Sequence, residues 1–91
     1  MKIMAIFDTP GMTATQYEQV DQALTALGQQ QPQGRLHHVA APNENGWLVI
    51  DVWESQAALD HFAQTLMPIF AEHDIPTTVP QILPVHNIIQ P

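Results

Sequence analysis

The spacing of apolar positions in the first third of the chain changes from a continuous run to a helical period. Residues 3–7 are apolar on both faces, which is typical of a short buried strand. A Pro-Gly pair then favours a turn. Apolar residues next recur at helical spacing, at Tyr17, Val20, Leu24 and Leu27. Because Thr13 precedes Gln16 in a capping-box pattern, a helix is predicted over Thr13–Leu27.

The middle of the chain predicts two strands joined by a hairpin. A strand is predicted over Arg35–Ala41, followed by a loop over Pro42–Gly46 that ends in Asn-Gly. Trp47–Trp53 is the clearest strand in the sequence, because aromatic and β-branched residues favour this conformation.

The last third predicts a helix and an edge strand. Ser55 is placed to cap a helix. Its apolar stripe consists of Leu59, Phe62, Ala63, Leu66, Ile69 and Phe70. Pro68 is expected to kink this helix or loosen its last turn. The final strand is predicted over Val85–Ile89 at a sheet edge, where the preceding prolines are tolerated. The predicted fold is a single α+β domain over residues 1–91, a ferredoxin-like βαββαβ antiparallel sheet with two helices on one face.

The strand Trp47–Trp53 is apolar on both faces, and this bears on assembly. Leu48, Ile50 and Val52 lie on one face; Trp47, Val49 and Trp53 lie on the other, with Asp51 as its only polar member. An antiparallel sheet with one face in water alternates apolar and polar side chains. Two helices cover one face and no element remains for the other, so we expect a homodimer formed through the sheet face.

The charge balance narrows the class of partner. The formal charge is −7, with Lys2 and Arg35 as the only permanent cations. Nucleic acid and anionic membrane surfaces require basic clusters, so neither is an expected partner. The chain has no cysteine, and no His or carboxylate spacing indicates a metal site, so neither a metal nor a cofactor is predicted. An apolar or weakly polar small molecule fits better, and the cytoplasm is the expected compartment.

Three polar side chains in the predicted sheet are candidates for acid–base chemistry. Asp51 is the one acid in an apolar strand, where a carboxylate acts either as a general base or as an acceptor for a neighbouring strand or a partner. His37 and His38 are adjacent on a strand and therefore face opposite ways. Whichever one faces the helices is a candidate proton shuttle near neutral pH.

The chain resembles the dimeric α+β barrel superfamily, and within it the antibiotic-biosynthesis-monooxygenase-like proteins. The resemblance covers nearly the whole chain. It rests on the run Asp51–Ser55 entering a helix with Leu59 and Phe62, on the Gly-x-Thr turn before the helix with Tyr17, and on the closing run 84–88. Members include cofactor-independent monooxygenases of phenolic or quinol-like compounds. The resemblance implies a dimer of face-to-face sheets, with a pocket between helices and sheet in each subunit.

The candidate substrate-binding residues for such a pocket are Trp53, Tyr17 and Phe62, and Trp53 is near the end of the central strand, where a pocket mouth would lie. Trp53 either stacks on a planar substrate or is a core residue at the strand–helix corner. Two classes of function follow: a cofactor-free oxygenase acting on a planar aromatic molecule, and a non-catalytic ligand-binding or stress-associated dimeric module. A buried cluster of Asp51 with a His and Tyr17 favours the enzyme. A helix–sheet space filled by apolar side chains favours the module.

Haem binding or degradation is a minor alternative that the superfamily also implies. That branch carries an Asn on the first strand, where this chain has Phe7 and Asp8, and a Trp on the second helix, where it has Phe62. Only His73 matches, near the expected position of the haem ligand.

Overall fold

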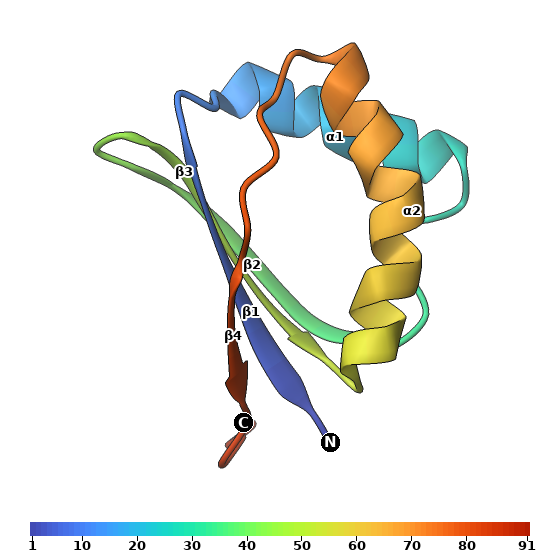
Figure 1. Ribbon diagram of the computed structural model, residues 1–91, viewed down its shortest axis with the longest axis vertical. Helices are drawn as coiled ribbons and strands as arrows, with labels where there is room; N and C mark the ends of the chain where they lie inside the picture. The colour runs from blue at the N-terminus through green and yellow to red at the C-terminus, as the bar shows by residue number, and fades with distance from the viewer.

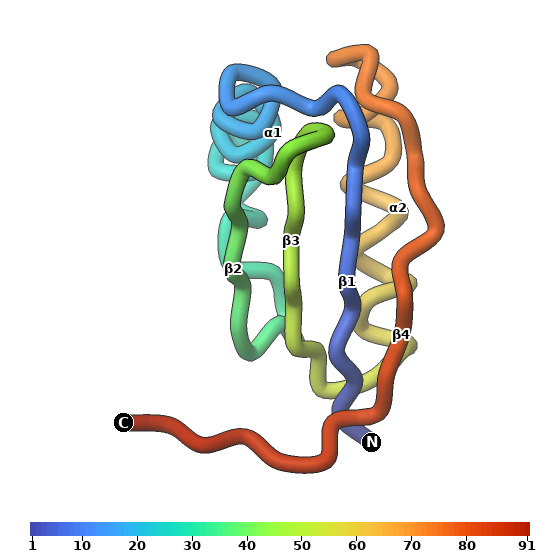
Figure 2. Tube along the Cα trace, turned by 90° about the vertical axis from the view of Figure 1, so that its left-hand side faces the viewer, coloured from blue at the N-terminus to red at the C-terminus, as the bar shows by residue number.

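The computed structural model describes residues 1–91 and has the predicted order of elements (Figure 1). The elements are β1 (Ile3–Pro10), α1 (Ala14–Ala26), β2 (Arg35–Asn43), β3 (Gly46–Trp53), α2 (Gln56–Glu72) and β4 (Gln81–Pro84). The strands form one antiparallel sheet in the order β2-β3-β1-β4, and both helices lie on one face of it (Figures 1 and 2). The predicted ferredoxin-like α+β fold is confirmed. Neither helix has the length and apolar character needed to cross a membrane.

Both helices begin at the caps that their sequences predict. The Thr13 hydroxyl accepts a hydrogen bond from the Gln16 N–H at 3.1 Å, and the Gln16 side chain accepts one from the Thr13 N–H at 3.0 Å. Ser55 caps α2 in the same way, accepting from the Ala58 N–H at 3.1 Å. Pro68 lies inside α2 without ending it, since the helix continues to Glu72.

The β2–β3 hairpin is tighter than predicted. Its connection is Glu44-Asn45 rather than Pro42–Gly46, since the strand residues resume at Gly46. The Asn43 side chain stabilises the turn by accepting a hydrogen bond from the Asn45 N–H at 3.2 Å. Pro42 is tolerated in the ladder because β2 is an edge strand. The short connection fixes the register of the two strands, which determines the site described below.

The last strand lies earlier in the chain than predicted. β4 spans Gln81–Pro84, and the residues of Val85–Ile89, predicted as the strand, have no regular structure. β1 begins at Ile3, which pairs with Pro84, so no β1 residue remains to pair with the chain after Pro84. One further hydrogen bond, from the Val85 N–H to the Lys2 carbonyl at 3.0 Å, ends the pairing. The prediction of an edge position is correct.

The two faces of the sheet differ in what covers them. Trp47, Asp51 and Trp53 face the helices and are buried. The opposite face, called the open face below, is covered by neither helix. It carries apolar side chains from all four strands: Met4, Ile6, Val39, Leu48, Ile50, Val52 and Leu83. Val39 is 62% exposed there, so the open face presents apolar area to solvent.

Candidate active site

His38 and Asp51 form a hydrogen-bonded pair at the centre of the helix-covered face. They are directly opposite each other in the β2–β3 ladder, and His38 Nδ1 lies 2.5 Å from Asp51 Oδ1. Asp51 is buried, at 4% exposure, whereas the His38 side chain retains 27%. An ionised carboxylate only accepts hydrogen bonds, so Nδ1 carries the proton of the pair. In the neutral ring, Nε2 then presents a lone pair away from Asp51.

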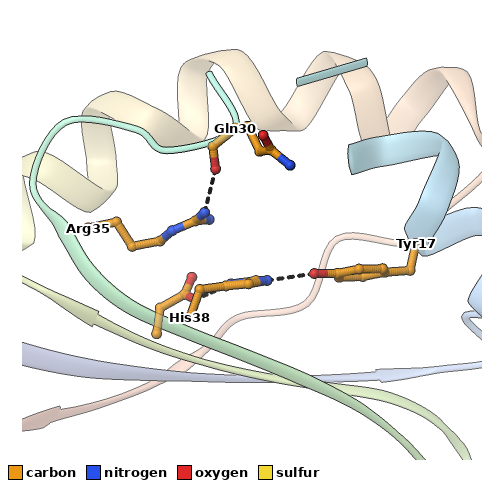
Figure 3. A network of polar contacts seen from close by, with 5 residues as sticks. Tyr17, Gln30, Arg35 and His38 are labelled. Atoms are coloured by element: carbon orange, nitrogen blue, oxygen red, sulfur yellow. Dashed lines mark hydrogen bonds and ion pairs between the residues drawn. The ribbon is translucent and has the colours of Figure 1, made fainter. Parts of the chain in front are cut away.

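Tyr17 of α1 is hydrogen-bonded to the other ring nitrogen of His38. Its hydroxyl oxygen lies 2.7 Å from His38 Nε2, and Figure 3 shows the two side chains end to end. Burial raises the pKa of Tyr17 above its ordinary value, and the nearby carboxylate of Asp21 raises it further. The phenol is therefore a protonated donor at neutral pH, and Asp51, His38 and Tyr17 form a hydrogen-bonded cluster.

A β-bulge brings Arg35 to the same face as His38. Arg35 is opposite Trp53 and His37 is opposite Val52, so Leu36 is the extra residue. The Arg35 guanidinium donates to the Gln30 carbonyl at 2.6 Å, which fixes the loop after α1 (Figure 3). It also lies 5.9 Å from the centre of the Phe62 ring. Regular alternation would put Arg35 and His38 on opposite faces, so no pattern in the sequence indicated this placement.

The cluster opens into a cavity of about 530 Å³ between the helices and the sheet. Its apolar wall is Phe7, Met12, Val20, Leu24, Val49, Leu59, Phe62, Leu66 and Phe70. Its polar wall is Thr9, Tyr17, Glu18, Asp21, Gln30, Gln31, Arg35, His38 and Asp51. The volume is within the range of pockets that bind small molecules. Phe62, Leu66 and Phe70 line this space without filling it.

Two other residues predicted for the site, His37 and Trp53, lie outside the cavity. His37 faces away from the cavity, and its Nε2 is 2.7 Å from the Gln90 amide nitrogen. Trp53 has no exposed surface and does not line the cavity. It packs behind Phe62, with ring centres 5.4 Å apart, so of its two predicted roles Trp53 has that of a core residue, and Phe62 provides the aromatic wall. Trp47 is a residue that sequence reasoning missed: its ring stacks on Tyr17 at 5.2 Å.

The residues present do not fit a haem. His73 ends α2 outside the cavity lining, and its carbonyl accepts a hydrogen bond from Gln16 at 3.2 Å. His38, the only histidine lining the cavity, has both ring nitrogens engaged by Asp51 and Tyr17. No group of three His, Asp or Glu side chains is arranged to hold a metal ion.

By sequence, the chain matches no protein-family model and no curated protein. By structure, it is similar to a putative antibiotic biosynthesis monooxygenase from Deinococcus radiodurans, with a TM-score of 0.60 and 14% identity over 99% of this chain and 97% of the other. It is also similar to a variant of SnoaB, a cofactor-independent oxygenase from Streptomyces nogalater, with a TM-score of 0.62 and 15% identity over 97% and 94%.

A third similar structure contains a ligand. It is the monooxygenase ActVA-Orf6 of Streptomyces coelicolor in complex with nanaomycin D, with a TM-score of 0.55 and 16% identity over 99% of this chain and 92% of the other. Each likeness covers nearly the whole of both chains. The resemblance found in the sequence is thus confirmed at the level of the fold.

Proposed function

We propose that this chain, which has the fold of the antibiotic-biosynthesis monooxygenases, is a cofactor-independent oxygenase of a planar, largely uncharged phenol. The observation that carries the proposal is the pair of His38 with the buried Asp51, directed into a cavity with a large apolar wall. Such chemistry needs a base and a dry pocket, because the deprotonated substrate itself supplies electrons to oxygen.

The proposed reaction begins with proton transfer to His38. The substrate hydroxyl gives its proton to the Tyr17 oxygen as the Tyr17 proton passes to His38 Nε2, and the Asp51 carboxylate stabilises the imidazolium. The phenolate gives one electron to O₂, and the two radicals join through a carbon–oxygen bond at the para ring carbon. The peroxide takes the proton back from His38, then loses water as the ring C–H proton leaves. One phenol and one O₂ thus become one quinone and one water.

The lining of the cavity supports a planar neutral substrate. Its wall includes the rings of Phe7, Phe62 and Phe70, which suit the face of an aromatic molecule. Arg35 is the only cation in the lining, and its guanidinium is already held by the Gln30 carbonyl. Glu18 and Asp21 also line the cavity, and their carboxylates would repel a substrate with several negative charges.

We also propose that two copies pair through the open face. Val39 and Ile50, which are opposite each other in the ladder, would form part of this interface. Pairing with a second copy buries apolar area that neither helix covers. The cavity lies on the other face of each sheet and stays accessible in such a dimer.

Oxygen uptake by the wild-type protein tests the proposed activity. A panel of phenols and 1-naphthols with a hydrogen on the para carbon is incubated with the protein, with heat-denatured protein as the control for spontaneous oxidation. Uptake above the control, with the matching quinone as product, supports the proposal. Nanaomycin D serves as a binding probe in the same samples, read from quenching of Trp fluorescence. Quenching without oxygen uptake supports the alternative, a non-catalytic ligand-binding module, and the absence of both rejects a ligand site in this cavity.

A further inference from the structure

Four side chains form a continuous chain from the interior of the protein to the cavity. Trp47 stacks on Tyr17 with ring centres 5.2 Å apart and planes inclined by 30°. Tyr17 is bonded through its hydroxyl to His38, and His38 to Asp51. We infer that Tyr17 is a redox-active tyrosine, which gives an electron to a radical oxidant in the cavity while its proton passes to His38. This role requires that an oxidant can enter the cavity, but it does not depend on the proposed oxygenase reaction.

The hydrogen bond from Tyr17 is arranged for loss of an electron and a proton together. A phenol that loses an electron becomes a strong acid, so a base already in contact lowers the cost of oxidation. The rings of Tyr17 and His38 are inclined by only 12° with centres 6.1 Å apart. With the oxygen 2.7 Å from Nε2, this describes an edge-to-edge contact in one plane, in which the nitrogen lone pair points at the hydroxyl.

Asp51 prepares His38 to receive that proton. Because Nδ1–H donates to the buried carboxylate, the ring has its acceptor nitrogen on the side of Tyr17. Once His38 is protonated, the new imidazolium remains paired with Asp51. The raised pKa of Tyr17 supports this direction of transfer, since the phenol still holds its proton before oxidation.

The radical is more stable on Tyr17 than on the stacked Trp47. The Trp47 indole N–H is buried and has no hydrogen-bond acceptor. A Trp47 radical cation therefore has no base for its proton, whereas a Tyr17 radical has His38. An electron lost from Trp47 is thus replaced from the stacked Tyr17. Trp53 also lacks an acceptor but packs on Phe62, outside this chain of contacts.

The balanced step has one electron and one proton. An organic peroxyl radical, the oxidant class we assign, takes the electron and becomes a peroxide anion. Tyr17 becomes a neutral phenoxyl radical and His38 an imidazolium, which passes its proton to the peroxide. The net change is a hydroperoxide and a tyrosyl radical in place of a peroxyl radical and a phenol. The step would protect the cavity wall from radical damage.

Flash oxidation tests the inference without an identified ligand. Photogenerated tris(bipyridine)ruthenium(III) supplies the one-electron oxidant, and transient absorption with electron paramagnetic resonance identifies the radical. Because the chain has a single tyrosine, any tyrosyl signal belongs to Tyr17. The folded wild type is expected to form a neutral tyrosyl radical, and Tyr17→Phe only tryptophanyl.

The His38→Leu variant separates proton acceptance from mere proximity. Its tyrosyl formation is expected to be at least about tenfold slower, since a hydrogen bond to a charged group is strong enough to change a rate by that factor. His37→Leu is the matched control, because His37 lies on the other face, and its rate is expected to match the wild type. The wild type is also expected to react more slowly in heavy water than in ordinary water, which tests the coupled proton independently of any variant.

Three results would overturn the inference. The first is a wild type that forms only tryptophanyl radicals. The second is a Tyr17 that is oxidised no faster in the folded protein than in the chain unfolded by guanidinium. The third is an equal rate in the His38→Leu and His37→Leu variants when both are folded by circular dichroism.

Discussion

His38 and Asp51 are direct cross-strand partners, and their side chains meet at 2.5 Å on the helix-covered face of the sheet. The geometry of one hairpin thus determines which nitrogen of His38 carries its proton. Any change that removes the acceptor at Asp51 changes the chemistry of His38 without moving the backbone.

Replacing the carboxylate tests this coupling. In Asp51→Asn the amide can donate to Nδ1, which would move the His38 proton to Nε2 and remove the acceptor for Tyr17. We expect nitrogen NMR of the imidazole to report the other tautomer. Urea unfolding should show a loss of about 1.5–3 kcal/mol, the range for hydrogen bonds to charged groups. Asp60→Asn is the control, since Asp60 bonds only an exposed Gln56, and it should change stability by less than about 0.5 kcal/mol. An unchanged tautomer would contradict the assignment.

The ionisation of Tyr17 is directly observable because it is the only tyrosine. Burial and Asp21 raise its pKa, so ultraviolet titration of the folded protein should give a midpoint above the ordinary value of 10.0. Tyr17 of the unfolded chain loses its proton at a lower pH than Tyr17 of the folded protein. The protonated phenol therefore contributes its full stabilisation of the folded state below pH 10.0, and this stabilisation is lost as the pH rises through the pKa of folded Tyr17. A midpoint at or below 10.0 would show a phenol that is not buried as described.

Phe62 both lines the cavity and packs on Trp53, and its burial determines the cost of removing it. The side chain is 5% exposed, so Phe62→Ala should lower the free energy of unfolding by about 3–5 kcal/mol. Met67→Ala on the same helix is the control, because Met67 is 44% exposed. Thermal melting compares the two. A loss below about 1 kcal/mol for Phe62→Ala would mean that the residue borders open space rather than the core.

The open face gives a prediction about assembly. Sedimentation of the wild type at micromolar concentration should report twice the chain mass. Val39→Glu places a charge on the open face and should give a monomer with an intact fold, since Val39 is already 62% exposed in one subunit. Val79→Glu makes the same change at a residue 96% exposed in the loop before β4 and should remain dimeric. A monomeric wild type would reject the proposed interface.

The sequence was sufficient for the fold because its strongest signals are local. The capping box at Thr13 and the run of aromatic and β-branched residues in β3 act within a few residues, and both elements formed where they were predicted. The last strand was misplaced because its position depends on where β1 begins, which is a property of the pairing. Proline spacing alone carries no information about that partner.

The choice between His37 and His38 depended on the hairpin. A two-residue turn at Glu44-Asn45 pairs His38 with Asp51, whereas the predicted five-residue loop fixed no register. The Asn-Gly pair did not indicate this turn, because the turn residues are Glu44 and Asn45 and Gly46 already belongs to β3. The position of Arg35 had no signal either, because it depends on a bulge at Leu36 that interrupts the alternation.

The central claim is that His38 is the base of this cavity, and a comparison of two adjacent histidines tests it most directly. The measurement is the initial rate of oxygen uptake with the best phenol of the panel, for wild type, His38→Leu and His37→Leu at matched folded concentrations. Because general bases typically contribute 10²–10⁴-fold, we expect a loss of about 100-fold or more in His38→Leu and an unchanged rate in His37→Leu. Equal rates in the two variants would contradict it.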